Sequence, residues 1–214
     1  MPKKSVNKII RALIVSDFFL FFSLGLLAPI FAVFILQNIE NKIEIIGYAV
    51  AVYWLTRVIT VIPISRIMDK MKGETDEYFF MIIGTLIISF VPLFYIVSSQ
   101  AWHIFLLQIV SGLANSMAVP AWRILFTNHI DSRIVGFEWS LEDVGVGLAT
   151  ATSAALGAYI ANRFGFNTLF VMVFSFGLIG VSILLTLSQT KRTIIKQLFG
   201  RRGDRAPFKI DDIK

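Results

Sequence analysis

The first long apolar stretch, residues 12–36, reads ALIVSDFFLFFSLGLLAPIFAVFIL and contains one ionisable side chain, Asp17. An α-helix needs roughly 20 apolar residues to cross a bilayer core about 30 Å thick. Only helices and closed barrels satisfy their backbone polar groups inside lipid, and the lack of period-two alternation favours a helix. This stretch therefore predicts a first transmembrane span.

Further apolar stretches of similar length follow along the 214 residues. We expect spans at residues 46–66, 78–97, 102–126, 141–161 and 168–187. Hydrophobic residues make up 56% of the chain and charged residues 16%, a composition that favours lipid over water as the solvent. The sequence predicts an all-α membrane protein with six transmembrane helices. Its expected parts are a basic N-terminal arm over residues 1–11, the six-helix domain over 12–189 and a basic tail over 190–214.

The 20 Lys and Arg residues are divided unevenly between the two sides of the membrane that these spans define. Most lie before the first span, between the second and third, between the fourth and fifth, or after the sixth. The opposite side holds only Lys42 and Arg163. The positive-inside rule therefore predicts that both termini lie in the cytoplasm, with the chain in a plasma or inner membrane. The net charge of +6 follows from this topology and does not indicate a nucleic-acid partner.

The two halves of the chain resemble each other weakly. Gly25 and Pro29 in the first span have counterparts in Gly112 and Pro120 of the fourth. Three spans make one unit, and an odd number of spans inverts the next unit, which is a common construction of secondary transporters. We therefore expect two inverted three-helix repeats. They cover about residues 12–97 and 102–189.

The loop after the second span carries the most specific motif. Ser65, three further residues, Asp69 and Lys70 are followed by Gly73. This order resembles the loop motif of the major facilitator superfamily, with Ser65 in place of the usual glycine and the second glycine one place late. The chain resembles the N-terminal half of that family from about residue 10 to residue 187. The resemblance implies half of a facilitator fold and transport of a small solute by alternating access.

The number of expected spans implies a partner, because this family normally has twelve spans in two halves. We expect a parallel homodimer in which the fifth span of each copy meets the second span of the other. Gly145, Gly147 and Gly157 would let helices approach closely there, or would serve packing within one bundle. The alternatives are one half of a heterodimeric transporter and a non-transporting membrane scaffold or accessory subunit. Met1 and the polar tail lead us to expect a complete gene product.

Ionisable residues inside a span are costly and need a partner or a wet cavity. Arg57 lies near the middle of the second span, so we expect it to meet an anionic solute group or a carboxylate, or to form a static ion pair. Asp17 lies about two turns into the first span, where it would carry a proton or simply be solvated at the membrane boundary. Glu142 and Asp143 point about 100° apart, so at most one faces the cavity.

Further polar residues complete the expected cavity and gate. Gln108 and Asn115 are seven residues apart and share a helix face. Arg123 is a natural counter-charge for the acids of the fifth span. The expected gate consists of Ser65, Asp69, Lys70, Arg123 and Asp131. The family resemblance implies that Asp69 and Lys70 act there with Asp131, the alternative being ordinary solvated loop charge.

Other chemistry is poorly supported by the sequence. The chain has no Cys, its two His are isolated, and it has no Gly-rich phosphate loop or nucleophile elbow. We therefore expect no enzyme, no metal and no cofactor. The expected partners are the lipid bilayer, a small solute and, for coupling, a proton.

Overall fold

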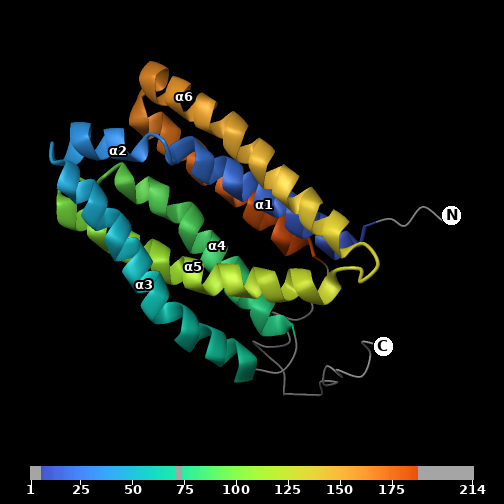
Figure 1. Ribbon diagram of the computed structural model, residues 1–214. Helices are drawn as coiled ribbons and strands as arrows, with labels where there is room; N and C mark the ends of the chain where they lie inside the picture. Colours follow the sequence, from blue (N-terminus) through green and yellow to red (C-terminus); the bar gives the residue numbers. More distant parts are fainter. Residues whose placement is uncertain (1–5, 71–73, 188–214) are drawn as a thin grey trace.

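The computed structural model describes residues 6–70 and 74–187; Gly73 of the loop motif and the tail over 190–214 lie outside the described residues. The described chain is helical throughout, joined by short turns (Figure 1). The elements are α1 (Lys8–Leu27), α2 (Phe31–Phe34), the π-helix η1 (Ile35–Ile39), α3 (Ile43–Lys70), α4 (Thr75–Tyr95), α5 (Ala101–His129) and α6 (Val135–Thr186).

The longest element, α6, consists of two helical arms joined by a sharp bend. Gly165 has φ 83° and ψ 168°, a backbone conformation that is open essentially only to glycine. Figure 1 shows the chain doubling back there. The two arms, 135–164 and 166–186, correspond to the expected fifth and sixth spans. With α6 taken as one element, five described helices are long and apolar enough to cross a membrane: α1, α3, α4, α5 and α6.

The first expected span is not one continuous helix. α1 ends at Leu27, and Pro29 lies in the turn that follows. Proline has no N–H to continue the helical hydrogen bonds, and the N–H of Ile30 instead reaches the Leu27 carbonyl at 2.9 Å. The chain then continues through α2 and η1. The sequence pattern alone did not reveal this interruption, because hydropathy stays high across it.

The connections gather at the two ends of the bundle. The start of α1, the end of α3, the α5–α6 turn and the end of α6 lie at one end, and η1, the α4–α5 turn and the Gly165 bend lie at the other (Figure 1). A cluster of buried apolar side chains packs together at each end of the bundle. The first contains Ile10, Leu13, Met81, Leu125 and Phe126, and the second contains Phe34, Ile35, Tyr95, Ile104 and Phe170.

The bundle contains two groups of closely packed helices, joined to each other by contact between α4 and α6. α1 packs along α6, where a Cβ on Gly157 would lie only 2.0 Å from the Leu26 carbonyl oxygen. α5 packs against both α4 and α3, and a Cβ on Gly112 would lie 2.7 Å from the Tyr53 carbonyl oxygen. Contact between α1 and α5 is slight. This division leaves space between α1 and α5 at the middle of the bundle.

Candidate solute cavity

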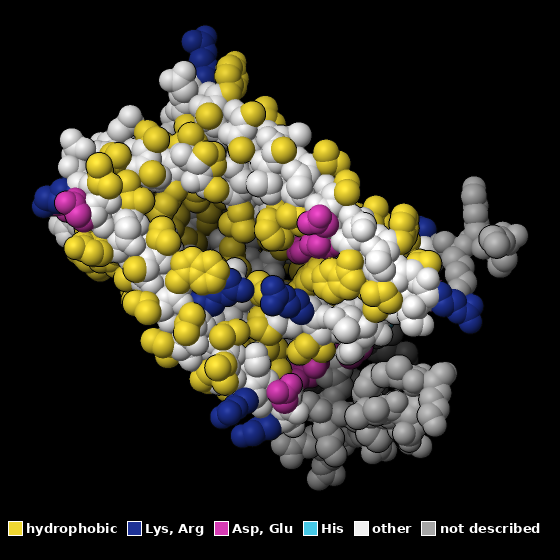
Figure 2. All heavy atoms as spheres, viewed as in Figure 1, with side chains coloured by type: hydrophobic (Ala, Val, Ile, Leu, Met, Phe, Trp, Pro, Cys, Tyr) yellow, Lys and Arg dark blue, Asp and Glu magenta, His cyan; other side chains and the backbone are white. Residues whose placement is uncertain are grey.

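A cavity of about 250 Å³ occupies the space between α1 and α5. Figure 2 shows the molecule hollowed here, with basic side chains on one rim and acidic side chains on another. Helices α1, α4, α5 and α6 all contribute to its wall. The lining residues are Asp17, Leu20, Phe21, Leu24, Met81, Thr85, Ile88, Asn115, Ala118, Val119, Trp122, Arg123, Trp139, Glu142 and Leu184.

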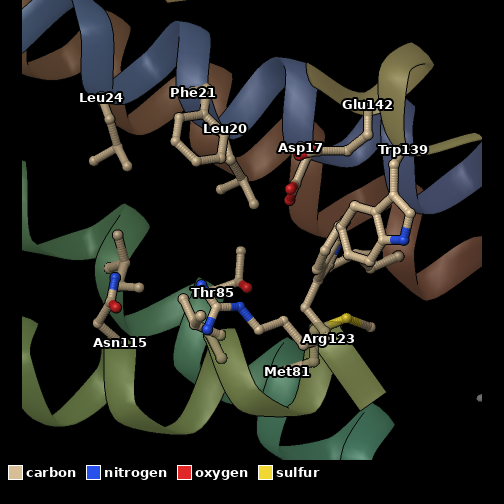
Figure 3. A pocket seen from close by; sticks show the side chains of 15 residues that line it. Asp17, Leu20, Phe21, Leu24, Met81, Thr85, Asn115, Arg123, Trp139 and Glu142 are labelled. Atoms are coloured by element: carbon tan, nitrogen blue, oxygen red, sulfur yellow. The ribbon is translucent and has the colours of Figure 1, made fainter. Parts of the chain in front are cut away.

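Most of the cavity wall is apolar and partly aromatic. Phe21 projects from α1, and Trp139 from the first arm of α6 (Figure 3). Trp122 of α5 lies 6.2 Å from Trp139 between ring centroids, in an edge-to-face arrangement. Such a wall can enclose the apolar body of a small solute, leaving a few polar groups to orient it.

Opposite charges face each other across the cavity. Asp17 is only 9% exposed and points inward from α1, and the Glu142 side chain extends toward it (Figure 3). Arg123 and Asn115 come from α5 on the opposite wall (Figure 3). Among the described residues, no ion pair of 4.0 Å or less joins Arg123 to either carboxylate. The charged groups are thus held apart by the open cavity.

The cavity wall also contains hydrogen-bonding atoms that have no protein partner. Asn115 Oδ1 and Trp122 Nε1 are buried and make no hydrogen bond within the part of the chain that the structure describes. Asn115 offers an acceptor and Trp122 a donor. Buried polar groups normally find partners, so these two atoms are suited to a solute or to water.

The structure brings some of the expected cavity residues together and separates others. Asp17, Asn115 and Glu142 line the cavity, whereas Arg57 and Gln108 do not. The Arg57 guanidinium lies over the Trp54 ring on α3, 5.0 Å from its centroid.

Gln108 and Asp143, which were also expected in the cavity, lie elsewhere. The Gln108 Nε2 donates to the Tyr95 hydroxyl at 3.5 Å, a long contact at the edge of the second apolar cluster. Asp143 is exposed outside the cavity wall, whereas Glu142, one residue earlier, lines the cavity.

The expected gate residues lie at one end of the bundle. Asp69 and Lys70 are exposed at the end of α3, and Ser65 is half-buried one turn earlier. Asp131 lies in the turn before α6, where its Oδ1 accepts from the Arg133 N–H at 3.0 Å. Arg123, also expected in the gate, lines the cavity from α5.

The glycines expected in helix packing have three different surroundings. Gly157 packs against the Leu26 backbone, and a Cβ on Gly145 would meet Ile14 at 3.7 Å. A Cβ on Gly147 would meet nothing within 4 Å in the described chain. Gly157 and Gly145 therefore face α1, and Gly147 faces away from the bundle.

Sequence reasoning missed several residues near the site. Thr85, Trp122 and Trp139 line the cavity but carry no motif. Glu138 is 0% exposed, and its Oε2 accepts from the Asp131 N–H at 2.9 Å. Its position four residues before Glu142 puts both acids on one helix face, a spacing that the sequence could have revealed.

Comparison with known proteins agrees with this architecture. The family model described as Major Facilitator Superfamily matches residues 13–210 of this chain. The chain belongs to the Major Facilitator Superfamily. The resemblance seen in the loop motif and span pattern is thereby confirmed, and with it a membrane protein of transmembrane helices.

Relatives within the superfamily are longer than this chain. The multidrug resistance protein MdtG of Salmonella schwarzengrund (strain CVM19633) is 24% identical over 170 residues, covering 76% of this chain and 40% of that protein. MdtG of Salmonella arizonae has the same identity and coverage. The chain thus spans about 40% of the length of these relatives.

The fold is also similar to that of a solved transporter structure. The in meso crystal structure of PepTSo, a transporter of the POT family, matches with a TM-score of 0.72 and 12% identity. The match covers 96% of this chain and 40% of that one. Nearly all of this chain therefore has a facilitator-type fold.

Proposed function

We propose that this chain is a half-size secondary transporter that moves a small solute across a membrane by alternating access. The observation that carries the proposal is the cavity in the middle of the bundle, where Asp17 and Glu142 oppose Arg123 across an aromatic wall. Ionisable residues at membrane depth are expensive and typically line solute or proton pathways. Membership of the Major Facilitator Superfamily supports the same function.

The cavity chemistry favours a small amphipathic solute. The wall supplies apolar and aromatic surface, two carboxylates, one guanidinium and the free acceptor of Asn115. Two carboxylates stand against one guanidinium, so the cavity suits a solute that carries a cationic or hydrogen-bond-donating group next to an apolar body. The name of the MdtG relatives, multidrug resistance protein, supports solutes of this kind.

We propose the proton as the coupling ion. With the cavity open, Asp17 and Arg123 are separated; closure would bring the two walls together. An empty cavity could then close with these charges paired, and a protonated Asp17 would remove that pairing. Solute binding and protonation of Asp17 would each change a different contact in the cavity. Each would therefore favour one of the two states of the transporter, as alternating access requires.

A partner half completes the proposed transporter. The chain spans about 40% of its relatives, and its cavity opens on one face of the bundle. We propose that two copies, each built of two inverted three-helix repeats and with both termini in the cytoplasm, form a parallel homodimer around a shared pathway. A twofold interface of this kind repeats symmetrically and closes.

The test is transport by the purified chain in liposomes. Ethidium, a fluorescent amphipathic cation, serves as the probe, beside a zwitterionic and an anionic dye of similar size. We expect an imposed pH gradient to drive ethidium movement at several times the protein-free rate, and a protonophore to abolish the difference. If a stable dimer moves none of the three probes, transport is contradicted and a membrane scaffold is favoured.

A further inference from the structure

We infer that a basic segment of the chain beyond Leu187, residues 191–196, docks on the acidic first turn of α4 and supplies the positive charge that Asp76 lacks there. We call Glu74, Asp76 and Glu77 the acidic turn. Such docking would tie the end of α6 to the start of α4, and it does not depend on whether the chain moves a solute.

Asp76 is a buried carboxylate without a partner among the described residues. Its side chain is 1% exposed, and neither of its carboxylate oxygens makes a hydrogen bond there. No Lys or Arg side chain of the described chain lies within 4.0 Å of it. A buried charge is destabilising unless an opposite charge or hydrogen-bond donors compensate it. Asp76 therefore calls for a cation that the described helices do not supply.

The other two residues of the acidic turn add negative charge. Glu77 Oε2 is also buried without a hydrogen bond in the part of the chain that the structure describes, and Glu77 interacts with the charges of both Asp76 and Glu74. Glu74 has partners on α5. Its Oε1 accepts from Asn128 Nδ2 at 3.4 Å, and its Oε2 lies 3.4 Å from His129 Nε2. Asp76 and Glu77 are thus the two acids left for a partner from elsewhere.

The position of these acids at a helix start does not explain them. Acidic side chains are favourable in a first turn because they interact with its free N–H groups. Glu74, the N-cap residue, makes no side-chain cap hydrogen bond, and the Asp76 oxygens accept none from the described backbone. A cationic partner accounts for Asp76 better than helix capping does.

The chain beyond Leu187 begins beside the acidic turn. Leu187 packs in the same apolar cluster as Tyr78, which is two residues from Asp76. Lys191 and Arg192 follow Leu187 by four and five residues. An extended chain spans about 3.3–3.6 Å per residue, so these two residues have roughly 13–18 Å of backbone with which to reach Asp76.

Asp76 lies on the side of α4 that faces away from the cavity. Phe94, five helical turns further along and on the same face, is 54% exposed. Met81 and Thr85 project from the far side of the helix and line the cavity. A segment that docks on Asp76 would therefore lie outside the cavity and leave it free.

Charge and tethering favour this segment as the occupant. Residues 191, 192 and 196 are Lys, Arg and Lys, and the sequence has no Asp or Glu from 188 to 203. A tethered segment binds at a high effective concentration, in the mM range for a short linker, so a few charged contacts suffice. Docking would brace the cavity wall, because Met81 of α4 and Leu184 of α6 both line it and share the cluster that contains Leu187.

The direction in which Asp76→Asn shifts thermal unfolding tests the pairing. Removing one partner of a buried ion pair is destabilising, whereas removing an unpaired buried charge is not. We expect Asp76→Asn to lower the unfolding temperature of the full chain in phosphatidylcholine discs by about 2–4 °C. In a chain that also carries Lys191→Gln and Arg192→Gln, the same substitution should no longer lower it, which is the coupling expected of residues in contact.

Two controls identify the source of the positive charge. Arg201→Gln with Arg202→Gln removes the same charge further along the chain, and Lys72→Gln removes a cation two residues before Glu74. Neither should change the effect of Asp76→Asn. An unfolding temperature that Asp76→Asn raises or leaves unchanged in the otherwise unaltered chain overturns the docking. So does an effect that Lys72→Gln cancels in place of the pair at 191 and 192.

Lipid composition separates docking from adsorption of the segment to the membrane surface. Anionic headgroups attract basic segments, so the measurements are repeated in discs that contain phosphatidylglycerol. We expect the coupling between Asp76 and the pair at 191 and 192 in phosphatidylcholine alone, and a weaker coupling where anionic lipid competes. Coupling that is absent in phosphatidylcholine, with the pair contributing only in anionic discs, assigns the segment to the lipid surface and overturns the docking.

Discussion

Asp17 shows what one side chain contributes to the cavity. It is 9% exposed, lines the cavity from α1 and faces Arg123 across it (Figure 3). A hydrogen bond from a solute to this carboxylate is charge-assisted and is worth about 1.5–3 kcal/mol. Asp17 is therefore the residue whose replacement should affect transport most directly.

We expect Asp17→Asn to weaken solute binding roughly 10- to 100-fold, since each 1.4 kcal/mol corresponds to about tenfold. The amide keeps the shape of the side chain but removes its charge and its ability to carry a proton. The measurement is the concentration dependence of ethidium transport in liposomes, with and without a pH gradient. Glu44→Gln, an exposed position at the start of α3, is the control. Unchanged affinity with transport still driven by the pH gradient would contradict both roles of Asp17.

Gly157 is a second residue whose role follows from one contact. An added Cβ would lie 2.0 Å from the Leu26 carbonyl oxygen, so α1 and α6 would have to separate. We expect Gly157→Ala to lower the free energy of unfolding by about 1–3 kcal/mol, the usual cost of overpacking. Thermal unfolding in detergent, followed by tryptophan fluorescence, measures the change.

The matched control for Gly157→Ala is Gly136→Ala. Position 136 is in the same helix, but an added Cβ there meets nothing within 4 Å in the described chain. This variant should be neutral or slightly more stable, because alanine restricts the unfolded chain more than glycine does. Equal unfolding temperatures for both variants would argue against the close α1–α6 contact.

At the scale of helices, the bend in α6 determines how the second half of the bundle is built. The first arm packs on α1, and in the second arm Gly177 lies against Ser89 of α4. Both contacts require the chain to reverse direction at Gly165. The reversal relies on a backbone conformation with φ 83° and ψ 168°.

We expect Gly165→Ala to destabilise the protein by about 1–3 kcal/mol, since side-chain-bearing residues rarely adopt this conformation. An added Cβ meets no described atom within 4 Å, so the loss would come from backbone strain and not from a clash. Thermal unfolding beside Gly136→Ala measures it. A loss no larger than that of the control would show that the bend relaxes to another conformation at little cost.

At the scale of the whole molecule, the described connections alternate between the two ends of the bundle (Figure 1). Among the described residues, Lys8, Arg11, Arg66, Lys70 and Arg133 lie at or near one of these ends, which we propose to be cytoplasmic. Orientation determines which side the solute enters from.

Single-cysteine labelling in intact cells should confirm this orientation. Asn41 and Ser132 are exposed in turns at opposite ends of the bundle, and the chain has no other Cys to interfere. We expect an impermeant maleimide to label Asn41→Cys in intact cells and Ser132→Cys only after permeabilisation. The opposite labelling pattern would reverse the proposed topology.

The sequence by itself determined the membrane environment, the helical class and the approximate limits of the helices. These properties depend on runs of contiguous apolar residues and on the charges at their ends, and both are local features of the sequence. The family resemblance rested in the same way on short local motifs. The break at Pro29 and the precise bend at Gly165 were missed, because hydropathy does not report backbone direction.

Only the tertiary structure decided which polar residues share the cavity. Asp17, Asn115 and Glu142 were expected there and line it, and Arg123 joins them from α5. Arg57 was also expected there, but it lies on α3 outside the cavity wall. The physical reason is that a residue's depth in the membrane follows from its position in the chain, whereas its neighbours depend on how each helix is rotated and packed against the others.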